Sequence, residues 1–465
     1  MRTTRLLPAA ALVLFACTSS TPPFAPAHPV VAYPPEGPVV LRGESFVAEG
    51  DVRVLAEKGL SWETTAAVSP HNPRNAVVGV IERSTHHVDT YVTHDAGHSW
   101  IAGSLPVRAT NGRDYPSQGD PVVVADRTGV FHYGVLVSNA RNTAVAATRS
   151  LDGGLTWSAP VIIAELTIGA AGDRQFDDKE WMAVDDTGGA YDGHVYLLWQ
   201  RITFGATPLQ SRMMFARSTD RGATWSEPVF LTDPATGGQS MVDVGPDGEV
   251  YLAYFRSSGL WLRKSTDGGA TFGAPAAIPS LPWIGGAIPN TRTAQFRAFP
   301  QLLCDRSNGP HRGTLYLVHA SSAPGTPRYG GVALTKSTDG GATWTTPRFL
   351  FTPAADAILP SGAVDQTTGE LAIAWLDRRD DPTNTLARLY AMRSKDGGAT
   401  FETPRGFTPQ FSIDADWIGD YYGMAGNNAN WIATFSPASG QMSAVRLRFD
   451  DTPTPPAKKR RSSRH

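Results

Sequence analysis

The sequence is poor in cysteine, with only 2 in 465 residues, Cys17 and Cys304. Cys17 ends an N-terminal apolar segment, and Cys304 closes the apolar run of residues 299–304, so we expect Cys304 to be a single buried thiol. A disulfide framework is therefore excluded. Stability has to come from the burial of apolar side chains between packed sheets.

Long apolar runs and metal-binding patterns are also missing. The apolar stretch at residues 6–15 is shorter than the roughly 20 residues that a membrane-spanning helix needs. The 11 histidines show no ligand spacing, and the adjacent His86 and His87 would point to opposite faces of a strand. We therefore expect no metal and no cofactor.

The two ends of the chain differ in composition from its middle. Arg2 and Arg5 precede the apolar stretch, a pattern typical of an export signal over residues 1–17. The end of this segment, Leu-Phe-Ala-Cys, resembles a bacterial lipobox and implies lipidation at Cys17, with an ordinary signal peptide cut nearby as the alternative. Residues 18–38 contain seven prolines and predict an extended linker, and the Pro-rich, basic residues 451–465 predict a disordered tail. We expect a cell-surface or outer-membrane lipoprotein, or otherwise a secreted protein.

The part of the chain between these ends is acidic. Without the two arginines of the leader and the five basic residues of the tail, the 41 Lys/Arg fall to 34 against 43 Asp/Glu. An acidic body argues against nucleic acid as the main partner. We expect a monomer.

One octapeptide, Ser/Thr-x-Asp-x-Gly-x-Thr/Ser-Trp/Phe, occurs six times, at residues 93–100, 150–157, 218–225, 265–272, 337–344 and 394–401. Its aspartate can accept hydrogen bonds from N–H groups of its own turn, and its glycine supplies a positive φ. The closing aromatic ring can bury a large apolar face. Six copies at intervals of 47 to 72 residues indicate a repeat architecture.

These copies resemble the Asp box, or bacterial neuraminidase repeat, of the sialidase superfamily, and the resemblance spans roughly residues 61–449. It implies a hairpin turn at the periphery of each blade, away from the active site. The six repeat aspartates are therefore interpreted as structural: Asp95, Asp152, Asp220, Asp267, Asp339 and Asp396.

Short β-rich runs separated by Gly/Asp turns predict an all-β fold of four-stranded antiparallel sheets, and radial repetition of such sheets makes a β-propeller. The first two strands of the unit recur seven times within residues 39–450, which predicts a single seven-bladed propeller, with the six-bladed sialidase form as the alternative. The seventh unit lacks an octapeptide and a fourth strand. We expect residues 39–47, or a neighbouring N-terminal segment, to supply that strand and close the ring.

The topology predicts where a site can form. In such sheets the starts of first strands and the ends of second strands share the face opposite the octapeptide turns, so their polar side chains converge there. By residue type, a sialidase-like mechanism would use Tyr421 with Glu180 as the nucleophile pair and Asp120 or Asp420 as the acid/base. Arginines that clamp the substrate carboxylate would be Arg201, Arg297 and Arg378. The alternative is that Arg378 pairs with Asp377 or Asp380, and Asp178 with Lys179, as ties between blades.

Two functions follow from this pattern. The first is an exported exo-sialidase-type glycoside hydrolase, and the second is a non-catalytic surface propeller that binds carbohydrate or protein. The resemblance implies a glycan or glycoconjugate partner in both cases. The sequence departs from the family in its extra unit and in its Phe-Arg motif, Phe296-Arg297, which lies in the fifth unit instead of the first.

Overall fold

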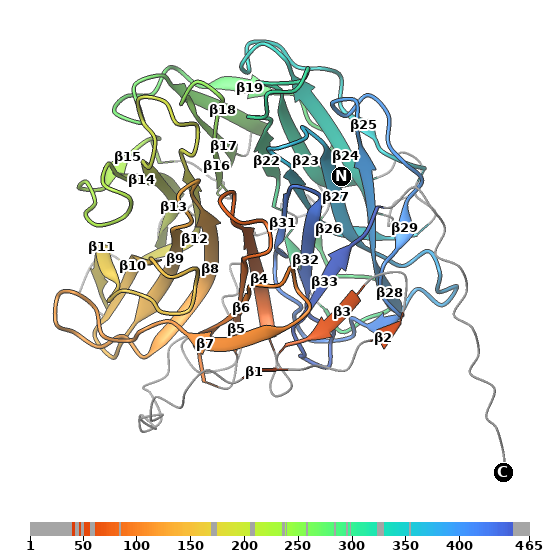
Figure 1. The fold of residues 1–465 in the computed structure, drawn as a ribbon, viewed down its shortest axis with the longest axis horizontal. Coiled ribbons are helices and arrows are strands. Elements are labelled where there is room, and N and C mark those ends of the chain that lie inside the picture. Colours follow the sequence, from red (N-terminus) through yellow and green to blue (C-terminus); the bar gives the residue numbers. More distant parts are fainter. Residues whose placement is uncertain are drawn as a thin grey trace, which may run out of the picture.

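The computed structural model describes residues 40–41, 46–47, 51–55 and 61–449, apart from residues 83–84, 169–173, 205–209, 235–237, 239, 257–258, 283–284, 294–295, 298, 323–329 and 353–354. The described residues form strands and turns, and none of them forms a helix that could cross a membrane. Seven antiparallel sheets stand around a central axis as the blades of a propeller (Figure 1). The predicted seven-bladed fold is confirmed, and the six-bladed alternative is wrong.

Each blade has four main strands that run from the axis outward. The innermost strands, which determine the site, are β4 (Ser61–Val68), β8 (Ser117–Ala125), β12 (Arg174–Val184), β16 (Ser240–Val244), β22 (Gln301–Cys304), β26 (Ala357–Val364) and β31 (Met424–Asn427). The second strands are β5 (Ala76–Glu82), β9 (Phe131–Ser138), β13 (Val195–Phe204), β17 (Val250–Arg256), β23 (Leu315–Ser322), β27 (Leu371–Asp377) and β32 (Asn430–Phe435).

The third strands are β6 (His87–Thr93), β10 (Asn142–Ser150), β14 (Gln210–Ser218), β18 (Gly259–Ser265), β24 (Gly330–Ser337), β28 (Leu386–Ser394) and β33 (Ser443–Leu447). The fourth strands are β7 (Trp100–Ser104), β11 (Val161–Thr167), β15 (Val229–Phe230), β19 (Ala276–Ile278), β25 (Arg348–Phe349), β29 (Arg405–Gly406) and β3 (Asp51–Val54). A hairpin of β20 (Gly285–Gly286) and β21 (Phe296–Arg297) precedes the fifth blade, and β30 (Phe411–Ser412) pairs with β28.

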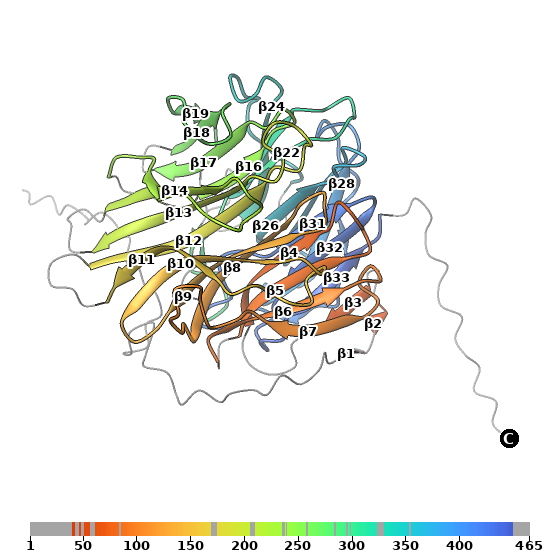
Figure 2. The ribbon, with the colours of Figure 1, turned by 60° about the vertical axis from the view of Figure 1, so that its left-hand side comes forward.

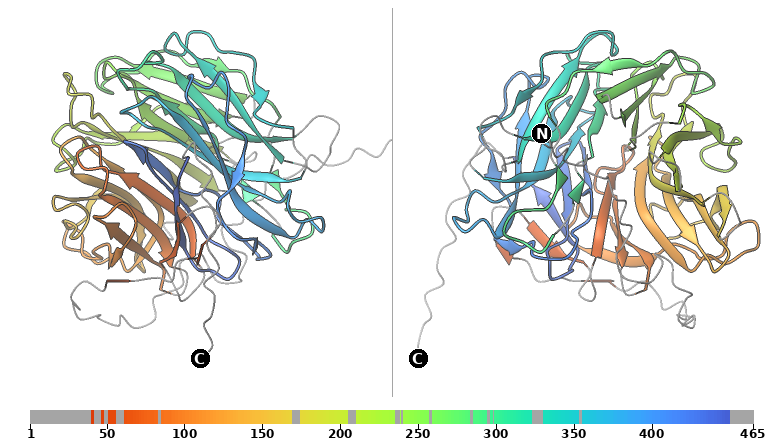
Figure 3. Two further views of the ribbon diagram at one scale, coloured as in Figure 1. Left: turned by 45° about the vertical axis from the view of Figure 1, so that its right-hand side comes forward. Right: turned by 180° about the vertical axis from the view of Figure 1, so that it is seen from behind.

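An N-terminal strand closes the ring, as predicted, but the neighbouring segment carries it instead of residues 39–47. Strand β3 pairs with β33 of the last blade, and β2 (Phe46–Val47) adds outside it (Figure 2). Strand β1 (Val40–Leu41) pairs instead with β7 of the first blade. Burial explains the choice, because Val52 and Leu55 pack into the apolar clusters on the two sides of the last blade. The rear view in Figure 3 shows the first and last blades side by side.

The second strands carry much of the core. All seven residues of β5 and all eight of β9 are buried, which is the pattern of a strand covered on both faces. Neighbouring blades share apolar clusters: Val77 of β5, for example, packs in one cluster with Phe131 of β9. Burial therefore holds the blades together, and Cys304, the cysteine among the described residues, is a free buried thiol.

The six octapeptides form identical turns between third and fourth strands. In the fifth blade Asp339 Oδ1 accepts the N–H of Thr343 (2.9 Å) and the hydroxyl of Ser337 (2.7 Å), and Ser337 Oγ accepts the N–H of Gly341 (2.9 Å). The same bonds recur in the other five turns. The turn also packs on the preceding blade, since a Cβ at Gly341 would lie 2.2 Å from Leu262. These aspartates are turn formers.

Candidate functional site

Four inner strands contain a β-bulge at the same position, near the end of the strand opposite the octapeptide turns. The ladder register shifts between Trp62 and Thr65 in β4, between Gly119 and Val122 in β8, between Asp178 and Trp181 in β12 and between Ile358 and Ser361 in β26. The first extra residue in each bulge has a left-handed backbone, with φ of 50° at Glu63, 46° at Asp120, 53° at Lys179 and 51° at Leu359. Such a backbone costs roughly 1–3 kcal/mol in a residue other than glycine and is concentrated at functional sites.

In the first three blades the bulge residue is charged, and the bulges bring the three side chains together. The Lys179 N–H donates to Asp120 Oδ2 (3.0 Å), and Glu63 is hydrogen-bonded to Asp120. Lys179 Nζ lies 3.6 Å from the ring centre of Tyr421, 4.0 Å from that of Trp181 and 4.8 Å from that of Phe299. One ammonium group is therefore enclosed by three aromatic rings from three blades.

The connection before β31 covers this cluster. Gly419 lies against the start of β4, where a Cβ would come 3.0 Å from the Glu63 nitrogen, and Asp420 acts electrostatically on the Glu63 carboxyl. Trp417 meets Trp62 edge to face, with ring centres 4.7 Å apart. Both tryptophans are partly exposed. We call this end of the propeller, formed by Trp62, Glu63, Asp120, Lys179, Glu180, Trp417, Asp420 and Tyr421, the mouth.

Burial perturbs the ionisable groups of the mouth. It raises the pKa of the Glu63 carboxyl well above its usual range, and the neighbouring Asp120 raises it further. Burial also raises the pKa of Glu180 and lowers the pKa of Lys179 to about 8. Glu63 Oε2, both Glu180 carboxyl oxygens and Lys179 Nζ have no hydrogen-bond partner among the residues that the structure describes. These polar atoms of the mouth are therefore buried without a partner among the described residues, and a donor or acceptor that reaches them would complete their hydrogen bonding.

The predicted catalytic residues lie together at the mouth, but not in the predicted contacts. The Tyr421 hydroxyl donates to the Pro121 carbonyl (3.3 Å) instead of to Glu180, and burial raises the pKa of Tyr421 well above its usual range. Asp120 and Asp420 are partly exposed, whereas Glu180 is fully buried. Asp120 is thus the member of the predicted set that combines access with a direct contact to the charged cluster.

The predicted arginine clamp looks different in the structure. Arg201 forms two hydrogen bonds with the buried Asp177, of 2.8 and 2.7 Å. Arg378 is fully buried and donates to Asp356 (3.0 Å) and to the Pro289 carbonyl (2.8 Å). Arg297 lies in β21, and the placement of its side chain is outside the described part of the structure, as is Cys17. Arg201 and Arg378 therefore tie strands to their neighbours, although the pairing partner of Arg378 is neither Asp377 nor Asp380.

Sequence reasoning did not single out Glu63, Lys179, Trp62 or Trp417 as site residues. The signal that could have found the first two is their position, because Glu63 and Lys179 stand at first-strand starts that correspond to Asp120. The β-bulges that orient these side chains cannot be recognised in the sequence pattern. The tryptophan pair joins residues 355 positions apart in the numbering, which only the closed ring brings together.

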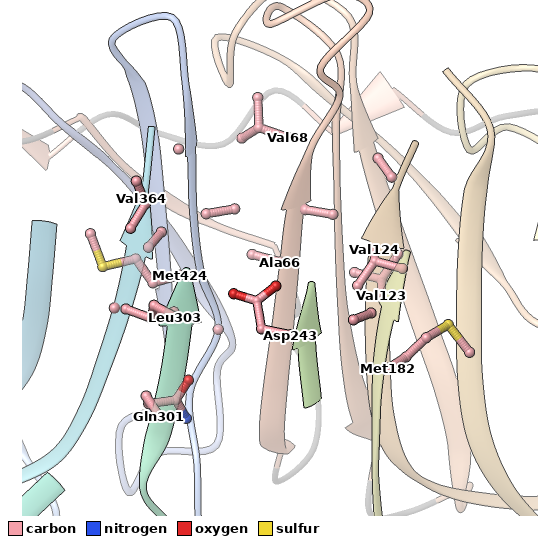
Figure 4. Close-up of a pocket in the computed structure, with 18 of the residues that line it drawn as sticks. Ala66, Val68, Val123, Val124, Met182, Asp243, Gln301, Leu303, Val364 and Met424 are labelled. Carbon is pink, nitrogen blue, oxygen red and sulfur yellow. The ribbon is translucent and has the colours of Figure 1, made fainter. Parts of the chain in front are cut away.

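A central channel lies between the bulges and the octapeptide face, with a cavity volume of about 210 Å³ and a lining drawn from all seven inner strands. Its lining near the mouth includes Thr65, Val122 and Trp181, each two residues beyond a bulge. Figure 4 shows Asp243 and Gln301 among mainly apolar side chains on the channel wall. Asp243 is engaged by the Arg306 guanidinium (2.9 Å) and the Cys304 N–H (2.7 Å), so it holds the wall together. Among the described residues, no group of three or more His, Cys, Asp or Glu side chains could hold a metal ion.

Comparison of the fold with solved structures finds several glycosidases. The Hadza microbial sialidase Hz136 is 14% identical, with a TM-score of 0.46, over 88% of this chain and 95% of that chain. A mutant of NanB sialidase from Streptococcus pneumoniae is 11% identical, with a TM-score of 0.47, over 80% and 83%. Penicillium chrysogenum alpha-L-arabinanase complexed with arabinobiose is 14% identical, with a TM-score of 0.42, over 70% and 94%. No protein-family model matches the chain, and no curated protein matches it.

Proposed function

We propose that this protein is a glycoside hydrolase that acts on glycans at the mouth, with Asp120 as its acid/base group and Glu63 as the hydrogen-bonded carboxyl that shares its proton. The observation that carries the proposal is the repeated bulge: blades one and two hold Glu63 and Asp120 in a left-handed backbone, so that their carboxyls meet. Two carboxyls joined by a hydrogen bond are too close to stand on the two sides of a glycosidic bond, which takes a separation of about 5 Å or more, so we expect them to act as one acid/base unit.

The environments of the two carboxyls fit these roles. Burial raises the pKa of Glu63, so the hydrogen-bonded pair retains a proton that can pass through Asp120 to a leaving group. Asp120 is partly exposed and accepts the Lys179 N–H, a bond that a carboxylate makes well. The partly exposed Trp62 and Trp417 supply aromatic surface on which the apolar face of a sugar ring can pack.

A panel of chromogenic glycosides, including neutral, amino and acidic sugars, tests the proposal on the full chain. We expect turnover of at least one member, with kcat reduced about 100-fold or more by Asp120→Asn and by Glu63→Gln, as for the loss of an acid/base group. Asp416→Asn is the control, since Asp416 is exposed and pairs with Arg292 at the surface. Binding without turnover, with both variants binding equally well, would support a non-catalytic glycan-binding propeller instead.

Exo-sialidase activity is a second candidate, because Tyr421 is electrostatically coupled to Glu63, Asp120 and Glu180, the residue types that a tyrosine nucleophile needs. The buried hydroxyl and the engaged arginines count against it. A fluorogenic sialoside separates the two mechanisms. If the sialoside is cleaved and Tyr421→Phe abolishes only that activity, the tyrosine mechanism is supported.

The cellular location belongs to the proposal as well. We infer that the chain is exported and anchored through a lipid on Cys17, from the lipobox-like end of residues 1–17. Radiolabelled palmitate should be incorporated into the wild-type protein and lost in Cys17→Ser, which should appear in the soluble fraction. Equal labelling of the two proteins would contradict the anchor.

A further inference from the structure

The mouth carries more carboxyl groups than cationic groups. Inner strands and the connection before β31 bring five carboxyls around one ammonium group, that of Lys179: Glu63, Asp120, Asp178, Glu180 and Asp420. The guanidinium of Arg201, at the same end of β13, is already bonded through two nitrogens to Asp177. Burial raises the pKa of Glu63 and Glu180, but the remaining carboxyls, those of Asp120, Asp178 and Asp420, still outnumber the ammonium group, so the mouth is unsuited to a sugar acid and suited to a cation.

The resident lysine shows that this environment accepts an ammonium group. Lys179 is 3% exposed, and its Nζ contacts the faces of Trp181, Phe299 and Tyr421 without a hydrogen-bond partner among the described residues. Aromatic faces and nearby carboxyls are the groups that hold an alkylammonium in proteins. Lys179 itself occupies the space beside these three rings, so a second cation would have to bind elsewhere in the mouth.

Three other carboxyls of the mouth, those of Glu63, Asp120 and Asp420, are candidates to contact such a ligand. Glu63 is 5% exposed, and its Oε2 has no partner among the described residues, so it can accept a hydrogen bond from a bound donor. Asp120 and Asp420 are partly exposed and flank Glu63. Trp62, next to Glu63 in β4, and Trp417, three residues before Asp420, are partly exposed and contact each other.

We infer that the mouth binds sugars that carry a protonated amine, the 2-amino-2-deoxyhexoses, in preference to their N-acetylated and acidic counterparts. The inference rests on the proposed function and adds the charge class of its substrate. The amine would lie between Asp120 and Asp420 and donate to Glu63, and the sugar ring would pack on the tryptophan pair. Acetylation removes the charge and two of the donors, so it should weaken binding.

Calorimetric titration of the full chain with a glucosamine tetrasaccharide, its fully N-acetylated form and a sialylated trisaccharide tests the inference. We expect the free amine to bind at least 10-fold more tightly than the acetylated form in 50 mM salt. That advantage should shrink at 500 mM salt, because salt screens charge pairs. Asp420→Asn should reduce the advantage several-fold, whereas the control Asp416→Asn, four residues earlier in the same connection, should leave it unchanged.

The outcomes separate this inference from the proposed function. Equal or tighter binding of the acetylated or sialylated ligand would overturn the preference for an amine. If that binding is lost in Trp62→Ala, the mouth remains the glycan site. Absence of binding for all three ligands would overturn the preference for an amine, and the chromogenic panel would then decide the proposed function on its own. The salt dependence of the wild-type protein gives a result even if a variant fails to fold.

Discussion

Replacing Lys179 by methionine tests the physical description of the mouth. The side chain is 3% exposed, and burial is the largest cause that lowers its pKa from 10.5 to about 8. Since one pKa unit corresponds to about 1.4 kcal/mol, the charged lysine costs about 3 kcal/mol of folding free energy. Methionine has a similar shape without the charge, so Lys179→Met should stabilise the protein by up to about 3 kcal/mol at pH 6.5.

The sign of the pH dependence follows from the same pKa. The unfolded chain keeps the lysine proton up to a pH of about 10.4, whereas the folded chain releases it above a pH of about 8. Between these values the unfolded state binds more protons, so the stability of the wild-type protein should rise with pH. The gain from Lys179→Met should therefore be full below pH 8 and disappear near pH 10.5.

Urea unfolding followed by tryptophan fluorescence at pH 6.5, 8 and 9.5 measures both effects. Lys395→Met is the control, because the Lys395 side chain is 47% exposed in an octapeptide turn, and it should change stability little. Binding of an amino sugar should tighten in Lys179→Met, because the substitution removes a positive charge from a mouth that we infer to bind a cation. Destabilisation by Lys179→Met at pH 6.5, or a wild-type stability that stays flat from pH 8 to 9.5, would refute the reasoning.

Three other predictions concern the scaffold. Ser337→Ala should lower the free energy of unfolding by about 1–3 kcal/mol, because it leaves the buried Gly341 N–H without its acceptor. Thr338→Ala, at an exposed position, is the matched control, and equal effects of the two substitutions on urea unfolding would contradict the structural role of the turn. Deleting residues 18–55 should lower the melting temperature far more than deleting residues 451–465, because only the first removes β3 and exposes the edge of β33; equal melting temperatures would be inconsistent with ring closure by β3. Burial raises the pKa of Asp89 from 3.8 to about 7, so the folded state binds an extra proton between these values and the stability of the protein should fall as pH rises from about 4 to about 7. Asp89→Asn should flatten this dependence of stability on pH, and an unchanged dependence would show that another group binds the proton.

Much of the fold could be predicted from local sequence patterns. The octapeptide turns are built from bonds within five residues of one another, such as those of Asp339, so each copy specifies its own geometry. Second strands such as β5 are buried on both faces and read as continuous apolar runs. The closing strand was harder to place, because any short β-rich segment near residue 50 could pair with β33. Burial of Val52 and Leu55 in tertiary clusters decides between them.

The face that carries the mouth could also be predicted, since strand direction alone places first-strand starts opposite the octapeptide turns. The sequence did not predict which of the side chains on this face are free to contact a ligand. Arg201 and Arg378 have the chemistry of a carboxylate clamp, but each meets an aspartate, Asp177 and Asp356, on the partner strand or loop of its own blade. Pairing across strands depends on register, and the register in β12 shifts between Asp178 and Trp181. A single extra residue there decides which charges pair.

The bulges separate two features of the mouth: the backbone shape, which the blade requires, and the charged side chains, which it does not. Leu359 occupies the same bulge in the sixth blade, with φ of 51° and an apolar side chain, so this backbone shape belongs to the blade and does not require a charged residue. A leucine in that position is buried in the apolar core. Glu63, Asp120 and Lys179 occupy equivalent positions in three consecutive blades, where apolar residues would remove both the desolvation cost and the unpaired polar atoms. Stability alone would favour leucine at all four positions, and the three charged residues are therefore best explained by what the mouth binds.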